Sequence, residues 1–139
     1  MIDPVETLQT TIRGTLISDP GVTGLIDAES IRSGSSIPPT FPCVIMSDPQ
    51  TVNLGRTAGG QLLTRVYLDL HIWCLDQAAN TATHIGAALT NALWDMPEGS
   101  TLMIQEWVRP DFRYMRDPDP DKAYRHGVGT VEAVIMWRP

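Results

Sequence analysis

Alternation of apolar and polar residues is strongest between Leu62 and Trp73. The even positions of this stretch are nearly all apolar and are Leu62, Thr64, Val66, Leu68, Leu70 and Ile72. The odd positions are Leu63, Arg65, Tyr67, Asp69, His71 and Trp73. Because successive side chains of a strand point to opposite faces of its sheet, the pattern predicts a β-strand with one face on the core. The other face mixes aromatic and charged side chains, which suits a face partly covered by another subunit.

Two stretches show the spacing of three and four residues that predicts an amphipathic helix. The first follows Asp3 and Pro4, which suit a helix N-terminus, and ends at the turn sequence SDPG. Its apolar positions are Val5, Leu8, Ile12 and Leu16. The second helix is expected over Gln77–Asp95, with Asp76 as its cap. Its apolar positions are Ala78, Ala82, Ile85, Leu89 and Leu93.

Three further strands are expected, and they are Cys43–Ser47, Leu102–Arg109 and Gly127–Trp137. Arg32–Pro42 is interpreted as an irregular surface connection. Asp48–Gln61 is polar, contains three glycines and has no apolar period, so it is interpreted as a loop. A loop of this length in a small domain usually has a function or is disordered.

Pro110 cannot donate to a sheet, so the third strand must bend or lie at an edge there. Asp111–His126 is then expected to project as a β-hairpin. Together these elements predict an α+β fold: a two-layer sandwich with a mainly antiparallel four-stranded sheet, two main helices packed on one face, and the projecting hairpin. A chain of 139 residues suits a single domain, residues 1–139.

Composition narrows the function. The formal net charge is −6 and only one of the ten basic residues is a lysine, so the surface repels nucleic acid at long range. A surface that DNA passes without adhering remains compatible with this charge. The sequence has no apolar run long enough to span a bilayer and no visible secretion signal, so the expected compartment is a cytoplasm. Cys43 and Cys74 lie in apolar stretches and are expected to be buried thiols.

No metal, cofactor or catalytic site is expected. The aspartates of the sequence DPDPDK match the first half of a calcium loop. Lys122 stands where such a loop needs glycine, however, and Val128 where it needs glutamate. No sequence motif of a hydrolase, zinc protease or phosphate-binding loop is present.

The arm Asp111–His126 carries four acidic and four basic residues together with several aromatic side chains. It lacks the excess positive charge of a phosphate-binding arm. Aromatic residues and arginine are enriched at protein interfaces, whereas a solvated hairpin is the alternative interpretation. The candidate residues for contact with another subunit or partner are Arg56, Arg65, Tyr67, Trp73, Phe112, Arg113, Tyr114, Arg116, Asp117, Asp119, Asp121, Tyr124 and Arg125.

The order of these segments resembles the tail-terminator, or tail-completion, proteins of long-tailed phages, prophages and gene transfer agents. The resemblance rests on the first helix with SDPGVTGLI, on FPCVIMSD with its glycine-containing loop, on YLDLHIWC followed by ATHIGAALTNALWD, and on the closing RYMRDPDPDKAYRHGVGTVEAVIMW. It covers nearly the whole chain. The family's turn before the last strand is usually shorter and contains glycine, and here it is DPDPDK.

The resemblance implies a structural virion protein and no enzyme. Such proteins form a homohexameric ring that caps the tail tube, stops its growth and joins it to the head-side connector or stopper, while DNA passes through the lumen. The expected partners are therefore the chain itself, the tail tube protein and the head-side protein, with no membrane. The expected location is the head–tail junction of the particle, after assembly from the host cytoplasm. The alternatives are another neck component (a head–tail stopper or adaptor) and a small hydrolase that uses Asp69 and His71 or the aspartates of the arm.

Overall fold

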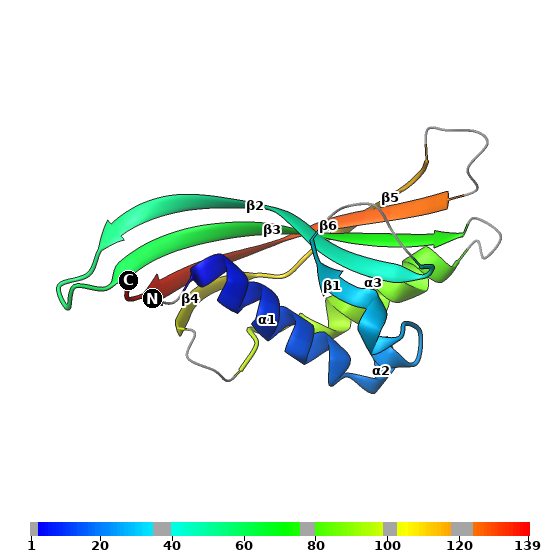
Figure 1. Cartoon of the computed structure of the whole chain (residues 1–139), viewed down its shortest axis with the longest axis horizontal. Coiled ribbons are helices and arrows are strands. Elements are labelled where there is room, and N and C mark those ends of the chain that lie inside the picture. Colours follow the sequence, from blue (N-terminus) through cyan, green and yellow to red (C-terminus); the bar gives the residue numbers. More distant parts are fainter. Residues whose placement is uncertain (1–2, 35–39, 76–79, 99–102, 118–123) are drawn as a thin grey trace.

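The computed structural model describes residues 3–34, 40–75, 80–98, 103–117 and 124–139. Within them the chain folds into a curved sheet with helices on one side of it (Figure 1). The helices are α1 (Pro4–Ile17), α2 (Pro20–Thr23), the 3-10 helix η1 (Ala28–Ser30) and α3 (Thr81–Ala92). The strands are β1 (Ile31–Ser33), β2 (Cys43–Arg56), β3 (Leu62–Leu75), β4 (Met103–Val108), β5 (Phe112–Arg116) and β6 (Tyr124–Trp137). The α+β class predicted from the sequence is thus confirmed.

The sheet of the described residues has six strands, so the expected number of four was wrong. Their order is β1-β2-β3-β6-β4, and β5 also pairs with β6. Among the described strands, only β1 runs parallel to its neighbour. The other pairs are antiparallel, and β2 and β3 are joined by a short hairpin connection.

β2 is the main departure from the sequence-based expectation. The segment interpreted as a loop, Asp48–Gln61, continues the strand as far as Arg56. All residues from Asp48 to Arg56 are exposed, so no burial pattern marks this half of the strand. Its order comes from the ladder with β3, in which Gln50 pairs with Tyr67 and Arg56 with Leu62.

The two ends of the sheet differ in their strands. At one end the second half of β2 pairs with β3, β3 with the end of β6, and β6 with β4. At the other end β4 is replaced by β5, and β1 lies beside the first half of β2. The tip of the β2–β3 hairpin, on the left of Figure 1, extends beyond α1.

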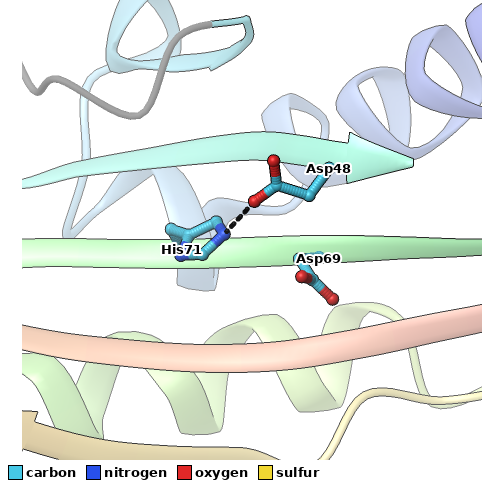
Figure 2. Close-up of side chains that lie close together, drawn as sticks. All are labelled: Asp48, Asp69 and His71. Carbon is cyan, nitrogen blue, oxygen red and sulfur yellow. Dashed lines mark ion pairs between the residues drawn. The ribbon is translucent and has the colours of Figure 1, made fainter. Parts of the chain in front are cut away.

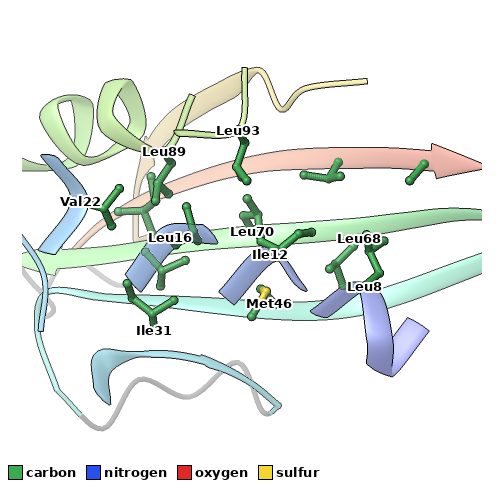
Figure 3. Packing of buried hydrophobic residues seen from close by; sticks show 14 of the residues in the cluster. Leu8, Ile12, Leu16, Val22, Ile31, Met46, Leu68, Leu70, Leu89 and Leu93 are labelled. Carbon is green, nitrogen blue, oxygen red and sulfur yellow. The ribbon is translucent and has the colours of Figure 1, made fainter. Parts of the chain in front are cut away.

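The core lies between the sheet and the helices (Figure 3). α1 begins as predicted, because the Asp3 carboxylate accepts hydrogen bonds from the backbone N–H groups of Val5 (2.8 Å) and Glu6 (3.3 Å). α3 starts after Asn80, later than expected, and the expected cap Asp76 lies outside the described residues. The even positions of β3 from Thr64 onward are buried, which confirms the predicted core face. Members of the core with no exposed surface include Leu8, Ile12, Leu16, Leu68, Leu70, Ile72, Leu89 and Leu93.

β5 belongs to the sheet, so the described part of the predicted projecting hairpin is not a free arm. Phe112 pairs with Gly129 and Tyr114 with Gly127, and both aromatic side chains pack against the core. Added Cβ atoms at these glycines would lie 2.9 Å from Phe112 and 3.0 Å from Tyr114. A Cβ on Gly86 of α3 would overlap the Tyr114 hydroxyl. Three glycines therefore leave the space that two aromatic rings fill.

Candidate functional site

The odd positions of β3 lie on the sheet face opposite the helices, which we call the open face. These side chains are half-buried, from Leu63 to Trp73. Arg65 bridges two neighbouring strands there, since its Nε lies 3.1 Å from a Glu132 carboxylate oxygen and its Nη2 lies 3.5 Å from one of Glu106. The mixed aromatic and charged face predicted from the sequence is therefore held in place by cross-strand contacts.

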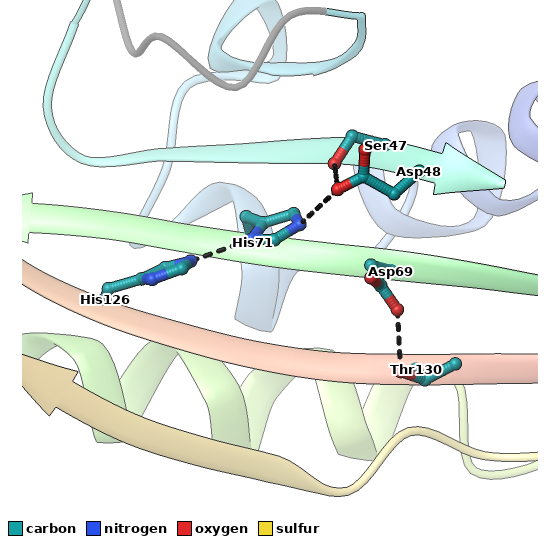
Figure 4. Close-up of polar contacts among 6 residues, drawn as sticks. All are labelled: Ser47, Asp48, Asp69, His71, His126 and Thr130. Atoms are coloured by element: carbon teal, nitrogen blue, oxygen red, sulfur yellow. Dashed lines mark hydrogen bonds and ion pairs between the residues drawn. The ribbon is translucent and has the colours of Figure 1, made fainter.

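A polar chain crosses the open face near its centre (Figure 4). Ser47 Oγ donates to Asp48 Oδ2 at 3.3 Å, and that oxygen lies 3.6 Å from His71 Nε2. His71 Nδ1 contacts His126 Nε2 at 2.8 Å. The His126 ring in turn stacks on Trp73, with centroids 4.0 Å apart and an angle of 4° between the planes.

The position of Asp48 depends on the backbone geometry at the start of the exposed half of β2. Its φ of 52° is in the left-handed region, and a register shift separates the pairs made by Ser47 and Gln50. Such a bulge turns a side chain away from its regular direction. Here it brings the Asp48 carboxylate toward the imidazole of His71, as Figure 2 shows.

The order of groups in this chain does not match a hydrolase. In a serine triad the histidine stands between the hydroxyl and the carboxylate. Here Asp48 stands between Ser47 and His71, so the hydroxyl has no imidazole base. Asp69, proposed with His71 as a hydrolytic pair, accepts a hydrogen bond from Thr130 at 2.7 Å. Burial raises the pKa of Cys43 to about 11, which keeps that thiol protonated and non-nucleophilic.

Asp48, Asp69 and His71 are the described residues that come closest to a metal-ligand set. Their ligand atoms lie within 4.8 Å of one another. A tetrahedral zinc ion with bonds of about 2.0 Å holds its ligands roughly 3.3 Å apart, and Asp48 Oδ2 lies 3.6 Å from His71 Nε2. Asp48 is 73% exposed and Asp69 is already bonded to Thr130. We therefore assign no metal ion to these three residues.

Acid should destabilise the fold through His126. Burial, and then the neighbouring His71, lower the pKa of His126, and Asp117 partly opposes them. The unfolded chain, with a histidine pKa of about 6.5, therefore takes up this proton at a higher pH than the folded chain does. The free energy of unfolding should fall as the pH drops through about 6.5 toward the folded pKa. Urea unfolding at several pH values measures this slope.

Two variants make the acid experiment specific. His126→Phe keeps a flat ring for Trp73 but cannot titrate, so its slope near pH 6 should be smaller than that of the wild type. His84→Gln removes an exposed histidine of α3, on the helix side of the sheet, and serves as the control for the loss of a histidine elsewhere. Equal slopes for wild type and His126→Phe would contradict the assignment to His126.

The candidate interface residues fall into separate groups. Arg65, Tyr67 and Trp73 share the open face, while Arg56 is exposed at the far end of β2. Arg113 and Arg116 are exposed on β5. Asp119 and Asp121 lie outside the described residues.

The aromatic residues of the arm contact other parts of the same chain. Phe112 and Tyr114 are half-buried on the helix side of the sheet. Tyr124 stacks on Phe41, with ring centroids 4.7 Å apart. Asp117 donates its backbone N–H to the Tyr124 carbonyl at 3.0 Å, and Arg125 pairs with Arg116 in the β5–β6 ladder. Contact of these residues with a partner stays a prediction, and the structure adds an internal packing role for Phe112 and Tyr114.

The His71–His126 contact and the strand character of residues 50–56 were not anticipated. The two histidines stand 55 positions apart in the sequence, and only the β3–β6 register brings them together. The apolar residues Val52 and Leu54 of the second half of β2 were the available signal for a strand.

The described residues form an α+β fold in which helices cover one side of a six-stranded sheet and polar cross-strand contacts lie on the other. The sequence matches the family described as Tail completion protein gp17 over residues 10–136. The chain belongs to this tail-completion family, and it is a structural, non-enzymatic phage-tail protein. The small-hydrolase alternative is therefore wrong.

A solved structure shares the fold over nearly the whole chain. It is described as "Virion of native gene transfer agent (GTA) particle", with 14% sequence identity and a TM-score of 0.71. The similarity covers 98% of this chain and 99% of that one. No curated protein matches the sequence. Among the described residues, no helix has the length and apolar character needed to cross a bilayer.

Proposed function

We propose that the chain is a tail terminator: it forms a six-membered ring that caps the finished tail tube, stops its growth and joins it to the head-side connector. The observation that carries this proposal is membership of the tail-completion family over residues 10–136. The proposed site of action is the head–tail junction of a virion or phage-like particle, reached from the host cytoplasm. The proposed partners are the tail tube protein on one side and the head-side connector or stopper on the other.

The charge of the chain supports passage of DNA through such a ring. Each chain carries a formal charge of −6, so six copies would carry about −36. An acidic wall repels phosphate groups and therefore favours passage over adhesion. DNA is then a transient occupant of the lumen and no specific ligand.

The open face supports contact with other proteins. Tyr67 and Trp73 offer half-buried aromatic surface, and Arg65 with its two glutamate partners adds charge of both signs. Interfaces commonly combine aromatic anchors with a charged surround. We assign this face to contacts within the neck of the particle.

Deletion of the gene in the producing strain tests the function. We expect tail tubes of uncontrolled length that remain separate from filled heads, and restoration of normal particles by the wild-type gene. Electron microscopy of the lysate measures both properties. Tails of normal length that fail to join heads would instead indicate a stopper or adaptor. Normal particles without the chain would overturn both assignments.

A further inference from the structure

Two edges of the sheet have no strand beside them in the described structure, and both lie at the same end. One is the outer edge of Gln50–Arg56 in β2, since β1 pairs with β2 only at Val44–Met46. The other is the outer edge of β4, Met103–Val108, whose inner edge pairs with β6. Figure 1 shows this end of the sheet on the left.

Neither edge contains lysine or proline, although each has one register shift in its ladder, between Asn53 and Gly55 in β2 and between Ile104 and Glu106 in β4. Protein sheets commonly block a free edge with lysine, proline or inward-pointing charges. Gln50–Arg56 has one charged residue, Arg56 at its end, and β4 has one, Glu106. Both edges also expose apolar side chains: Val52 is 41% and Leu54 43% exposed, and Met103 and Val108 are each 50% exposed.

The two edges are complementary in direction. At this end β2, β3, β6 and β4 alternate in direction, because each neighbouring pair is antiparallel. β2 and β6 therefore run in one direction, and β3 and β4 run in the opposite direction. If a second copy is placed in the same orientation with its β2 next to β4 of the first, these two strands run in opposite directions. The new junction would be antiparallel, like the three junctions within each chain. Val52 and Val108 pair with residues of the open face, so a joined sheet would bring apolar side chains of both edges to the same side.

We propose that Gln50–Arg56 of one copy pairs with Met103–Val108 of the next copy, so that a continuous sheet runs from subunit to subunit. The contact joins two different surfaces and is therefore head-to-tail, which generates a ring where the rotation closes. Closure into a ring rests on the proposed function, whereas the edge pairing itself does not. A second copy is the favoured occupant because one chain supplies both halves of the junction, in equal orientation and similar length.

Lysine substitutions at the edges test the pairing. Val52→Lys and Val108→Lys each introduce on an exposed position the residue that natural edges use against pairing. Each should raise the protein concentration needed for assembly about tenfold or more. The matched control is Leu25→Lys, since Leu25 is 42% exposed and lies outside the sheet. Native mass spectrometry measures assembly, and circular dichroism of the dilute chain verifies folding.

Cross-linking tests which edges meet. Variants with one added surface cysteine, Val52→Cys and Val108→Cys, are mixed under assembly conditions and treated with a short bis-maleimide. The native Cys43 and Cys74 are buried, so they do not compete. We expect linked pairs of one Val52→Cys chain with one Val108→Cys chain, and few pairs within either variant alone. The same mixture can be incorporated into particles if assembly requires the tail tube.

The outcomes separate the inference from the proposed function. Wild-type assembly at normal concentration by both lysine variants, or cross-links only between two Val52→Cys chains, would overturn the edge pairing and leave the tail-terminator function intact. If the cross-links are specific for the two edges but deletion of the gene leaves tails of normal length, the edge pairing would be supported and the tail-terminator function refuted. If the Leu25→Lys control also loses assembly, the effect of lysine is not specific to the two edges, which would contradict the edge pairing.

Discussion

Leu70→Ala should destabilise the fold by about 2–5 kcal/mol, the range observed when a buried leucine is truncated and leaves a cavity. Leu70 lies at the middle of β3, has no exposed surface, and is paired with Met46 on one side and Gly129 on the other. It faces the layer that α1 and α3 form beneath the sheet, so no single element can move to fill the space. Urea denaturation of the purified chain measures the change.

The control for this experiment lies on the same strand. Leu75 is 44% exposed at the end of β3, so Leu75→Ala removes the same atoms from a site that water already reaches. Its cost should stay below about 1 kcal/mol. Similar losses for the two variants would show that the core is not centred on Leu70.

Gly86→Ala should destabilise the fold although alanine is the better helix former. The added methyl group meets the Tyr114 ring and hydroxyl, and overpacking of this kind costs roughly 1–3 kcal/mol. The helix preference for alanine returns up to about 1 kcal/mol of this cost. Thermal unfolding should therefore show a lower midpoint than the wild type.

Two further variants identify the cause. Gly14→Ala makes the same change inside α1, where nothing lies within 4 Å of the new Cβ, so it should stabilise the chain by about 0.4–1 kcal/mol. Tyr114→Phe removes the hydroxyl that overlaps the new methyl group, so adding it to Gly86→Ala should recover part of the loss. A Gly86→Ala variant as stable as Gly14→Ala would disprove the close contact.

The sequence predicted those elements whose own residues carry a burial pattern. β3 and α1 were found because apolar side chains recur along them at the period of a strand or a helix. The second half of β2 was missed because it is exposed along its whole length and depends on β3 for its order. β1 was missed because its three residues are too short to show a period.

The candidate site was predicted only in outline. The mixed face of β3 was evident from alternation, whereas the positions of Asp48 and His126 beside His71 depend on a bulge and on strand register. Phe112 and Tyr114 were interpreted as partner contacts, because an aromatic residue in a polar segment shows the same pattern whether its own helix or another protein covers it. Gly127 and Gly129, spaced by two, were the signal for internal packing.

The fit between the glycines and the aromatic rings of β5 also limits how this region can diverge. A side chain larger than glycine at position 86 or 127 requires a smaller residue at position 114. A larger side chain at position 129 likewise requires a smaller residue at position 112. These positions should therefore change in pairs among related chains, although they come from three distant parts of the sequence. A glycine in this region would be lost in evolution only together with the ring that occupies its space.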